Sequence, residues 1–111
     1  MNDLKNKKIL VTGASGGIGN AIVKKLNDHG AKILASGTKQ EKLDKLKLTF
    51  PAIKILKFDI SQHDKIDEFI EQTSTELGGG LDCIVNNAGI TQDNLAIRMT
   101  LDEWKKVIDI N

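Results

Sequence analysis

The stretch that decides the fold is KILVTGASGGIG, residues 8–19. Its first four residues form a short apolar run that leads into glycines, which predicts a buried strand. A helix is predicted to follow from Gly17 to His29. It carries Ile18, Ile22 and Leu26 at a spacing of four, and we expect these three side chains on its buried face. A strand that turns through glycines directly into a helix predicts the first unit of an α/β domain.

The rest of the chain repeats this alternation. Further strands are predicted over residues 31–35, 53–58 and 81–85, and further helices over residues 40–48, 61–77 and 100–111. Ser61 is expected to cap the third helix, with Asp64 in the capping-box position. Strands that alternate with helices form parallel sheets with right-handed crossovers and helices on both faces. The predicted fold class is therefore α/β: a partial Rossmann-type, doubly wound parallel sheet, with strands 1 to 4 in the spatial order 3-2-1-4.

Length, charge and cysteine content narrow the class of protein. The chain has 111 residues, enough for one domain, and its net charge of +1 gives no strong field for nucleic acid or an anionic membrane. Cys83 has no cysteine partner, and no apolar run indicates a signal peptide or a membrane span, so we expect a cytoplasmic protein. Cys83 is expected in the core rather than as a nucleophile. His29 and His63 are isolated from each other, so no metal site is expected.

The glycines after the first strand have a physical use. Gly13 lets the chain turn tightly, small residues let the backbone approach a pyrophosphate, and Gly19 lets the helix pack closely on the sheet. The charge of the pyrophosphate would then meet the free N–H groups and the positive end of the helix dipole. The alternative is a tight turn that binds no ligand. A Walker A phosphate loop is excluded, because no Gly-Lys-Ser/Thr follows at the required spacing.

Two motifs together resemble the short-chain dehydrogenase/reductase family: Thr12-Gly13-x-x-x-Gly17-x-Gly19 after the first strand, and Asn86-Asn87-Ala88-Gly89 after the fourth. The resemblance covers the whole chain and implies that residues 1–111 form an incomplete NAD(P)-binding Rossmann domain. The cofactor-binding residues that it implies in these motifs are Gly13, Ser15, Gly16, Gly17, Ile18, Gly19, Asn87, Ala88 and Gly89.

The resemblance also assigns the end of the third strand. It implies that Asp59 hydrogen-bonds the adenine of the cofactor and that Ile60 follows with its backbone. The alternative is that the important residue there is Ser61 alone, as a helix cap.

The choice of nicotinamide cofactor depends on the end of the second strand. Proteins of this fold that prefer NAD place an acid there, which accepts hydrogen bonds from the ribose hydroxyls. Residues 35–39 read ASGTK and contain no acid, and Thr38 and Lys39 are placed to contact a 2′-phosphate. This favours NADPH over NADH. The alternative for Lys39 is a solvated residue at the start of a Lys-rich helix.

Residues 87–99 are similar to the bacterial 3-oxoacyl-(acyl-carrier-protein) reductases of fatty-acid synthesis. This similarity implies hydride transfer from NADPH to a β-keto thioester carried by acyl-carrier protein, in a homotetrameric enzyme. The alternatives are another short-chain dehydrogenase, or a non-catalytic fragment for nucleotide binding or protein interaction. A methyltransferase built on the same sheet is disfavoured by the second motif.

Asn111 is a polar residue on the predicted apolar stripe of the last helix, seven residues after Trp104. By the resemblance it is the catalytic Asn, whose backbone holds a water in a proton relay. The alternative is an ordinary residue at a helix end. The Ser, Tyr and Lys that complete the family's active site are expected beyond this chain, which contains no tyrosine. We therefore expect the chain alone to be inactive, with a complementing C-terminal fragment as its partner.

Overall fold

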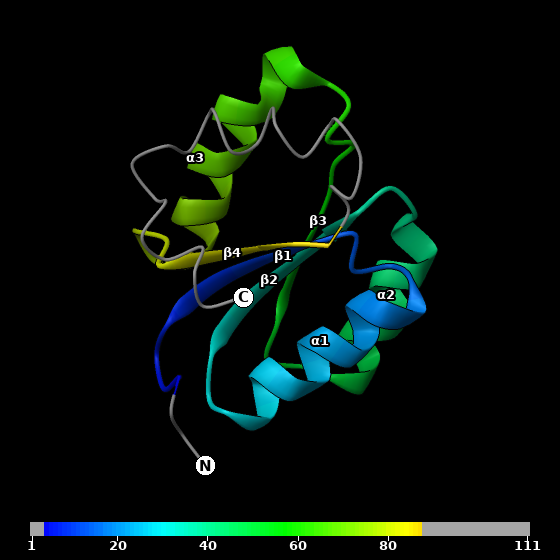
Figure 1. Ribbon diagram of the computed structural model, residues 1–111, viewed down its shortest axis with the longest axis vertical. Coiled ribbons are helices and arrows are strands. Elements are labelled where there is room, and N and C mark those ends of the chain that lie inside the picture. The colour runs from blue at the N-terminus through cyan, green and yellow to red at the C-terminus, as the bar shows by residue number, and fades with distance from the viewer. Residues whose placement is uncertain (1–3, 88–111) are drawn as a thin grey trace.

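The computed structural model describes residues 4–87, and Figure 1 shows strands and helices alternating along them. The elements are strand β1 Lys8–Thr12, helix α1 Gly17–Asp28, strand β2 Lys32–Gly37, helix α2 Gln40–Thr49, strand β3 Lys54–Lys57, the 3-10 helix η1 His63–Lys65, helix α3 Ile66–Glu76 and strand β4 Cys83–Asn86. The predicted alternation is confirmed for this part of the chain. The predicted last helix lies outside the described residues, as do Ala88, Gly89 and Asn111.

The four strands form one parallel sheet in the order β3-β2-β1-β4, which confirms the predicted order. β1 is central, since Ile9 lies opposite both Ile33 of β2 and Cys83 of β4. Because every neighbouring pair is parallel, the carboxyl ends of the strands lie at the same edge of the sheet.

Helices cover both faces of this sheet: α1 and α2 lie on one side and α3 lies on the other (Figure 1). Side chains alternate between the two faces along each strand, so two apolar cores form. The core on the α3 side includes Leu10, Leu34, Ile84, Ile66 and Phe69. The core on the side of α1 and α2 includes Ile9, Val11, Ile33, Val23 and Leu46. The doubly wound arrangement is therefore confirmed.

Strand boundaries differ slightly from the predicted ones. β2 continues through Ser36 and Gly37, which the sequence predicts as its end, because both still pair with β3. β4 begins at Cys83 rather than at Leu81. Just before it, the Asp82 carboxylate accepts a hydrogen bond from the Lys8 N–H at 2.8 Å, and the Asp82 N–H donates to the Lys8 carbonyl. These bonds fix the start of β4 beside β1.

Helix α1 packs through a face that only partly matches the predicted one: Ile22 and Leu26 pack against the core, as predicted, but Ile18 does not. Ile18 is 71% exposed and Ile22 and Leu26 are half-buried, whereas Gly19 and Val23 are buried. The prediction that Ile18 faces the interior is wrong. A Cβ at Gly19 would lie 2.4 Å from the Gly13 carbonyl oxygen, so the helix backbone itself lies against the turn there. Glycine has no side chain and therefore gives no signal in an apolar pattern.

The segment before α3 also differs from the prediction. The hydroxyl and the N–H of Ser61 donate to Asp59 Oδ1, at 2.7 and 2.9 Å, and η1 intervenes before α3 begins at Ile66. The predicted capping box of Ser61 and Asp64 is therefore wrong. Asp59 accepts the Ser61 N–H that the capping box would have assigned to Asp64, because an Asp side chain readily bonds the backbone two residues further on.

Candidate nucleotide-binding site

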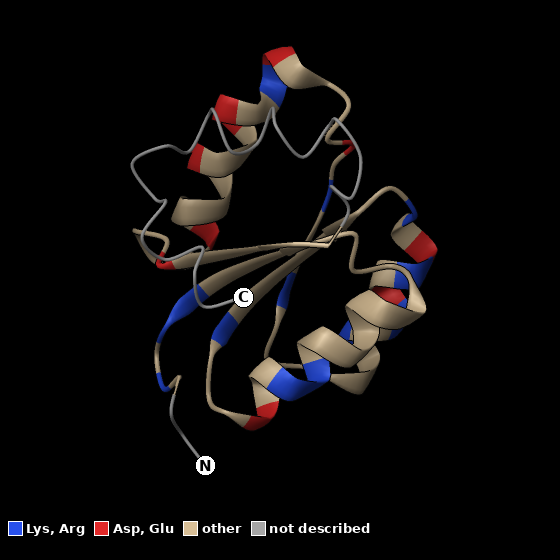
Figure 2. Cartoon of the chain, viewed as in Figure 1, with Lys and Arg blue, Asp and Glu red and all other residues tan. Residues whose placement is uncertain are grey.

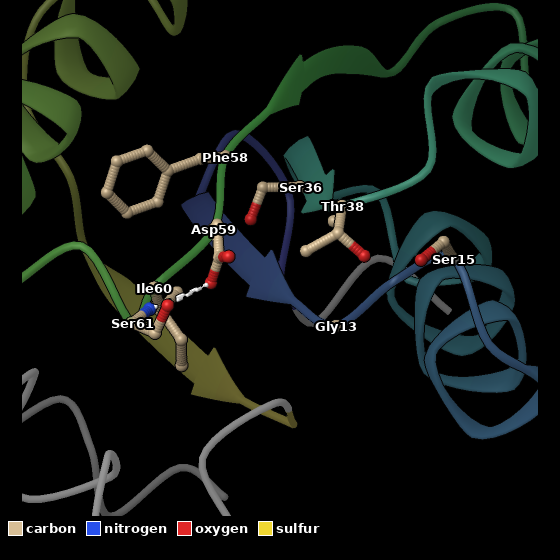
Figure 3. Close-up of a pocket in the computed structure, with 9 residues that line it drawn as sticks. Gly13, Ser15, Ser36, Thr38, Phe58, Asp59, Ile60 and Ser61 are labelled. Atoms are coloured by element: carbon tan, nitrogen blue, oxygen red, sulfur yellow. Dashed lines mark hydrogen bonds between the residues drawn. The ribbon is translucent and has the colours of Figure 1, made fainter.

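The candidate site lies where the carboxyl ends of β1, β2 and β3 meet, which is where open α/β sheets bind ligands. A cavity of about 240 Å³ is lined there by Gly13, Ser15, Ser36, Gly37, Thr38, Phe58, Asp59, Ile60 and Ser61. Figure 3 shows these residues converging from the turn after β1, the end of β2 and the segment after β3. The sheet order therefore brings together three segments that lie far apart in the sequence.

The turn between β1 and α1 forms one wall of the site. Gly13 has a φ of 62°, a left-handed conformation that favours glycine. The Ala14 N–H donates to the Ser36 carbonyl at 2.8 Å, which ties the turn to β2. A side chain on Gly19 would place its Cβ 2.4 Å from the Gly13 carbonyl oxygen, so the turn rests directly on the α1 backbone.

Two asparagine side chains hold the carbonyl groups of this turn. Asn20 Nδ2 donates to the carbonyls of Ala14 and Gly16, at 3.0 and 2.8 Å. Asn87 Nδ2 donates to the Gly13 carbonyl at 3.0 Å. These bonds fix the turn independently of any ligand. Asn20 was not expected from the sequence; its only signal is a short amide side chain in the first turns of a helix, where such residues commonly bond nearby backbone.

The N-terminus of α1 has the properties of an anion site. Gly16 is the N-cap, no side chain caps the helix, and its first turn carries no acidic residue (Figure 2). A Cβ built on Gly16 or on Gly17 would meet no atom within 4 Å. The first turn of a helix has N–H groups without helical partners and a positive dipole end. Open space at this end therefore suits a phosphate group.

The opposite wall of the site comes from the segment after β3. The hydrogen bond from the Ser61 hydroxyl, and then that from the Ser61 N–H, lowers the pKa of Asp59, so this carboxylate is ionised at neutral pH. Asp59 is the only charged residue among those lining the cavity. Phe58 stacks on Phe69 of α3, with ring centroids 4.1 Å apart, which anchors the segment to the core.

Hydrogen bonds also join the strand ends across the sheet. The Thr12 hydroxyl of β1 donates to Asn86 Oδ1 of β4 at 2.9 Å. Gly37 approaches the turn so closely that a Cβ there would lie 2.7 Å from Ser15 Oγ. The site thus lies at the ends of β1, β2 and β3 beside the start of α1, and the Thr12–Asn86 hydrogen bond joins β4 to β1 next to it.

The residues predicted as cofactor contacts fall into three groups. Those that line the cavity are Gly13, Ser15, Thr38, Asp59 and Ile60. Those at the start of α1 are Gly16, Gly17, Ile18 and Gly19, of which Gly19 is buried. Asn87 hydrogen-bonds the Gly13 carbonyl of the turn, and Ala88 and Gly89 lie outside the described residues, as does Asn111. Sequence reasoning did not predict four lining residues as cofactor contacts: Ser36 and Gly37, which close a predicted strand, Phe58, which continues an apolar strand pattern, and Ser61, which looks like a helix cap.

Other kinds of site find little support in the described part of the chain. Within residues 4–87, no group of three or more His, Cys, Asp and Glu side chains is placed to hold a metal ion. None of the helices described there is long and apolar enough to cross a membrane. Cys83 lies in the core, as predicted, and burial together with the nearby Asp82 charge raises the pKa of its thiol to about 11. A protonated thiol is a poor nucleophile.

Comparison with known proteins identifies the family. Residues 7–111 match the family model described as short chain dehydrogenase. The chain belongs to the short-chain dehydrogenase family. Members of this family bind a nicotinamide dinucleotide and are oxidoreductases, as the sequence motifs predict.

Several curated proteins are similar in sequence to this chain. The chain is 39% identical to nodulation protein G of Rhizobium sp. over 112 residues, which are 100% of this chain and 45% of that protein. It is 42% identical to the 3-oxoacyl-[acyl-carrier-protein] reductase FabG of Rickettsia conorii, again over 100% of this chain and 44% of that protein. The chain therefore spans about half the length of the curated relatives that it matches.

Solved structures give the same fold. A citronellol catabolism dehydrogenase of Pseudomonas aeruginosa matches with a TM-score of 0.79 and 20% identity, over 92% of this chain and 52% of that one. The RhlG/NADP active-site complex of the same organism matches with a TM-score of 0.76 and 24% identity, over 90% of this chain and 46% of that one. The chain thus shares its fold with about half of each of these solved structures.

Proposed function

We propose that this short-chain dehydrogenase chain is the cofactor-binding part of an NADPH-dependent 3-oxoacyl-(acyl-carrier-protein) reductase. The observation that carries the proposal is the junction of the uncapped α1 N-terminus with the cavity lined by Thr38 and Asp59. Residues 1–111 would then be an incomplete NAD(P)-binding domain. When bound, NADPH supplies a hydride for the carbonyl carbon of a β-keto thioester.

The described residues fit such a cofactor. The open space beside Gly16 and Gly17 accommodates a pyrophosphate against the α1 N-terminus. The cavity on the β2 and β3 side accommodates adenosine, with the ionised Asp59 as an acceptor for its amino group. Asn87, which holds the turn, would keep the N–H groups in place. We further propose Ala88 and Gly89 as cofactor contacts, and Asn111 as the catalytic Asn.

The preference for NADPH rests on the end of β2. Thr38 is exposed at the rim of the cavity and Lys39 follows it at the N-cap of α2. Asp59 is the cavity's only charged residue, and it comes from the segment after β3 rather than from the end of β2. A 2′-phosphate near Thr38 would therefore meet a hydroxyl and a lysine.

Replacing Thr38 by aspartate is expected to reverse the preference. An acid at this position repels a 2′-phosphate and accepts hydrogen bonds from free ribose hydroxyls. Calorimetric titration should show about a tenfold loss of NADPH affinity in Thr38→Asp, which is about 1.4 kcal/mol, with NADH affinity unchanged or increased. Thr49→Asp is the matched control, because Thr49 is exposed at the far end of α2. Equal losses for both nucleotides, or in both variants, would contradict the assignment.

A second candidate function is supported by the similar sequence identities of two relatives that have different names. Identity to nodulation protein G is 39% and to the Rickettsia reductase 42%, so another substrate for the same hydride chemistry is an alternative. A non-catalytic nucleotide-binding fragment is the other alternative. Substrate-dependent oxidation of NADPH by the corresponding longer protein, measured with acetoacetyl-carrier-protein and with other ketones, separates these functions.

The 111-residue chain itself is expected to be inactive. Reduction of a ketone requires a proton for the developing alkoxide, and no tyrosine is present to donate it as the family's acid does. NADPH absorbance in the presence of an acetoacetyl thioester should stay constant with purified chain. Consumption that depends on both the thioester and the chain would contradict this expectation.

The proposed partners rest on the strand order and on the similarity to the 3-oxoacyl-(acyl-carrier-protein) reductases. Among residues 4–87, β4 is the last strand of the sheet, on the side of β1 away from β2. We propose that a C-terminal segment, in the same protein or as a complementing fragment, adds its strands there. The acyl-carrier-protein thioester and a homotetramer are the proposed partner and assembly of the full-length enzyme.

A further inference from the structure

Two buried hydroxyl groups in residues 4–87 have no hydrogen-bond partner: those of Ser36 and Thr73. Ser36 is 1% exposed at the end of β2, and Thr73 is 0% exposed in α3. Folding removes such a group from water, and leaving it unpaired is unfavourable, so most buried hydroxyls have a partner. Of these two, only Ser36 lines the candidate cavity.

The backbone of Ser36 is fixed on both sides. It lies opposite Leu56 in the pairing of β2 with β3, and its carbonyl accepts the Ala14 N–H at 2.8 Å. The side chain is therefore held at a defined place in the cavity wall. Figure 3 shows its hydroxyl directed into the cavity, between Asp59 and Thr38. A ligand that fills the cavity would meet an oxygen that can both donate and accept.

We propose that Ser36 is a further nucleotide-binding residue, whose hydroxyl hydrogen-bonds the adenosine half of the bound dinucleotide. The inference rests on the proposed nucleotide function of the site. The adenosine half is indicated because the cavity is lined from the β1–α1 turn, the end of β2 and the segment after β3, and by no residue of β4. In sheets of this kind the residues at the end of β2 contact the ribose of the adenosine half.

The test compares Ser36→Ala with Thr73→Val in the 111-residue chain. Each change removes one unpaired buried hydroxyl at nearly constant volume, so neither should lower the melting temperature without nucleotide. In calorimetric titrations, Ser36→Ala should bind NADPH about fivefold more weakly than the unsubstituted chain, whereas Thr73→Val should bind it equally well. The same fivefold loss is expected with AMP, which carries only the adenosine half.

Different failures have different meanings. Unchanged NADPH affinity in Ser36→Ala would overturn the role of Ser36 and leave the nucleotide site standing. A lower melting temperature of free Ser36→Ala would mean that the hydroxyl already has a partner, which also overturns the inference. A loss for NADPH without a loss for AMP would overturn the adenosine assignment. If the unsubstituted chain binds neither nucleotide, the proposed site and the Ser36 inference both fall.

Discussion

Replacing Gly19 by alanine is expected to lower the free energy of unfolding by about 2 kcal/mol or more. The added Cβ would lie 2.4 Å from the Gly13 carbonyl oxygen and 2.5 Å from the Ala14 Cα, both of them backbone atoms. Alanine is favoured over glycine within a helix by about 1 kcal/mol, but overpacking against backbone typically costs about 1–3 kcal/mol. Steric overlap this close places the cost at the upper end, so the destabilising effect exceeds the helix-propensity gain.

Thermal or urea unfolding followed by circular dichroism measures this change. For a domain of about 100 residues, a loss of 2 kcal/mol corresponds to a fall in Tm of about 10 °C. A Gly19→Ala chain as stable as the unsubstituted one would show that the turn after β1 does not rest on α1 as described.

Replacing Gly17 by alanine should leave the free energy of unfolding almost unchanged but weaken NADPH binding. No atom lies within 4 Å of a Cβ at Gly17, so the substitution should change the free energy of unfolding by no more than about 0.5 kcal/mol. A methyl group there would occupy the space that we assign to the pyrophosphate. Charge-assisted hydrogen bonds contribute about 1.5–3 kcal/mol each and weaken when they lengthen, so NADPH affinity should fall by about thirtyfold to a hundredfold.

The two glycine variants are matched controls for each other, since they carry the same change two residues apart. Unfolding and NADPH titration should be measured on both. Gly17→Ala that binds NADPH as well as the unsubstituted chain would place the pyrophosphate elsewhere. A Gly17→Ala chain that is strongly destabilised would contradict the open space found at the start of α1.

Apolar periodicity and turn residues were sufficient to predict the sheet order and the position of the glycine turn. The rules of handedness limit the arrangements of a parallel sheet, and the glycine turn after the first strand is typical of the Rossmann order, which the sheet adopts as β3-β2-β1-β4. The apolar pattern gave the wrong environment for Ile18, because in the first turn of α1 the buried residue is Gly19, which has no side chain. The predicted face of a helix is therefore least reliable where the backbone itself makes the contact.

The polar details of the site were less predictable. Ser61 looks like a helix cap in the sequence, yet its hydroxyl and its N–H both donate hydrogen bonds to Asp59, two residues earlier. Asn20 acts on carbonyls of the turn that only the folded chain brings within reach. Ser36 follows an apolar run in β2, and its unpaired hydroxyl becomes evident only when burial and hydrogen bonding are considered together.

The central claim, that the cavity at the carboxyl ends of β1, β2 and β3 binds a dinucleotide, is tested most directly by amide NMR spectra of the labelled chain during addition of NADPH. The largest saturable shifts are predicted for residues 13–19, 36–38 and 59–61, which surround the proposed site. The described residues also contain a larger hollow of about 460 Å³ at the end of α2, lined by Asp44, Lys47, Leu48 and Pro51, and no shift is predicted there. Saturable shifts confined to that hollow, or a folded spectrum that does not change with NADPH, would contradict the claim.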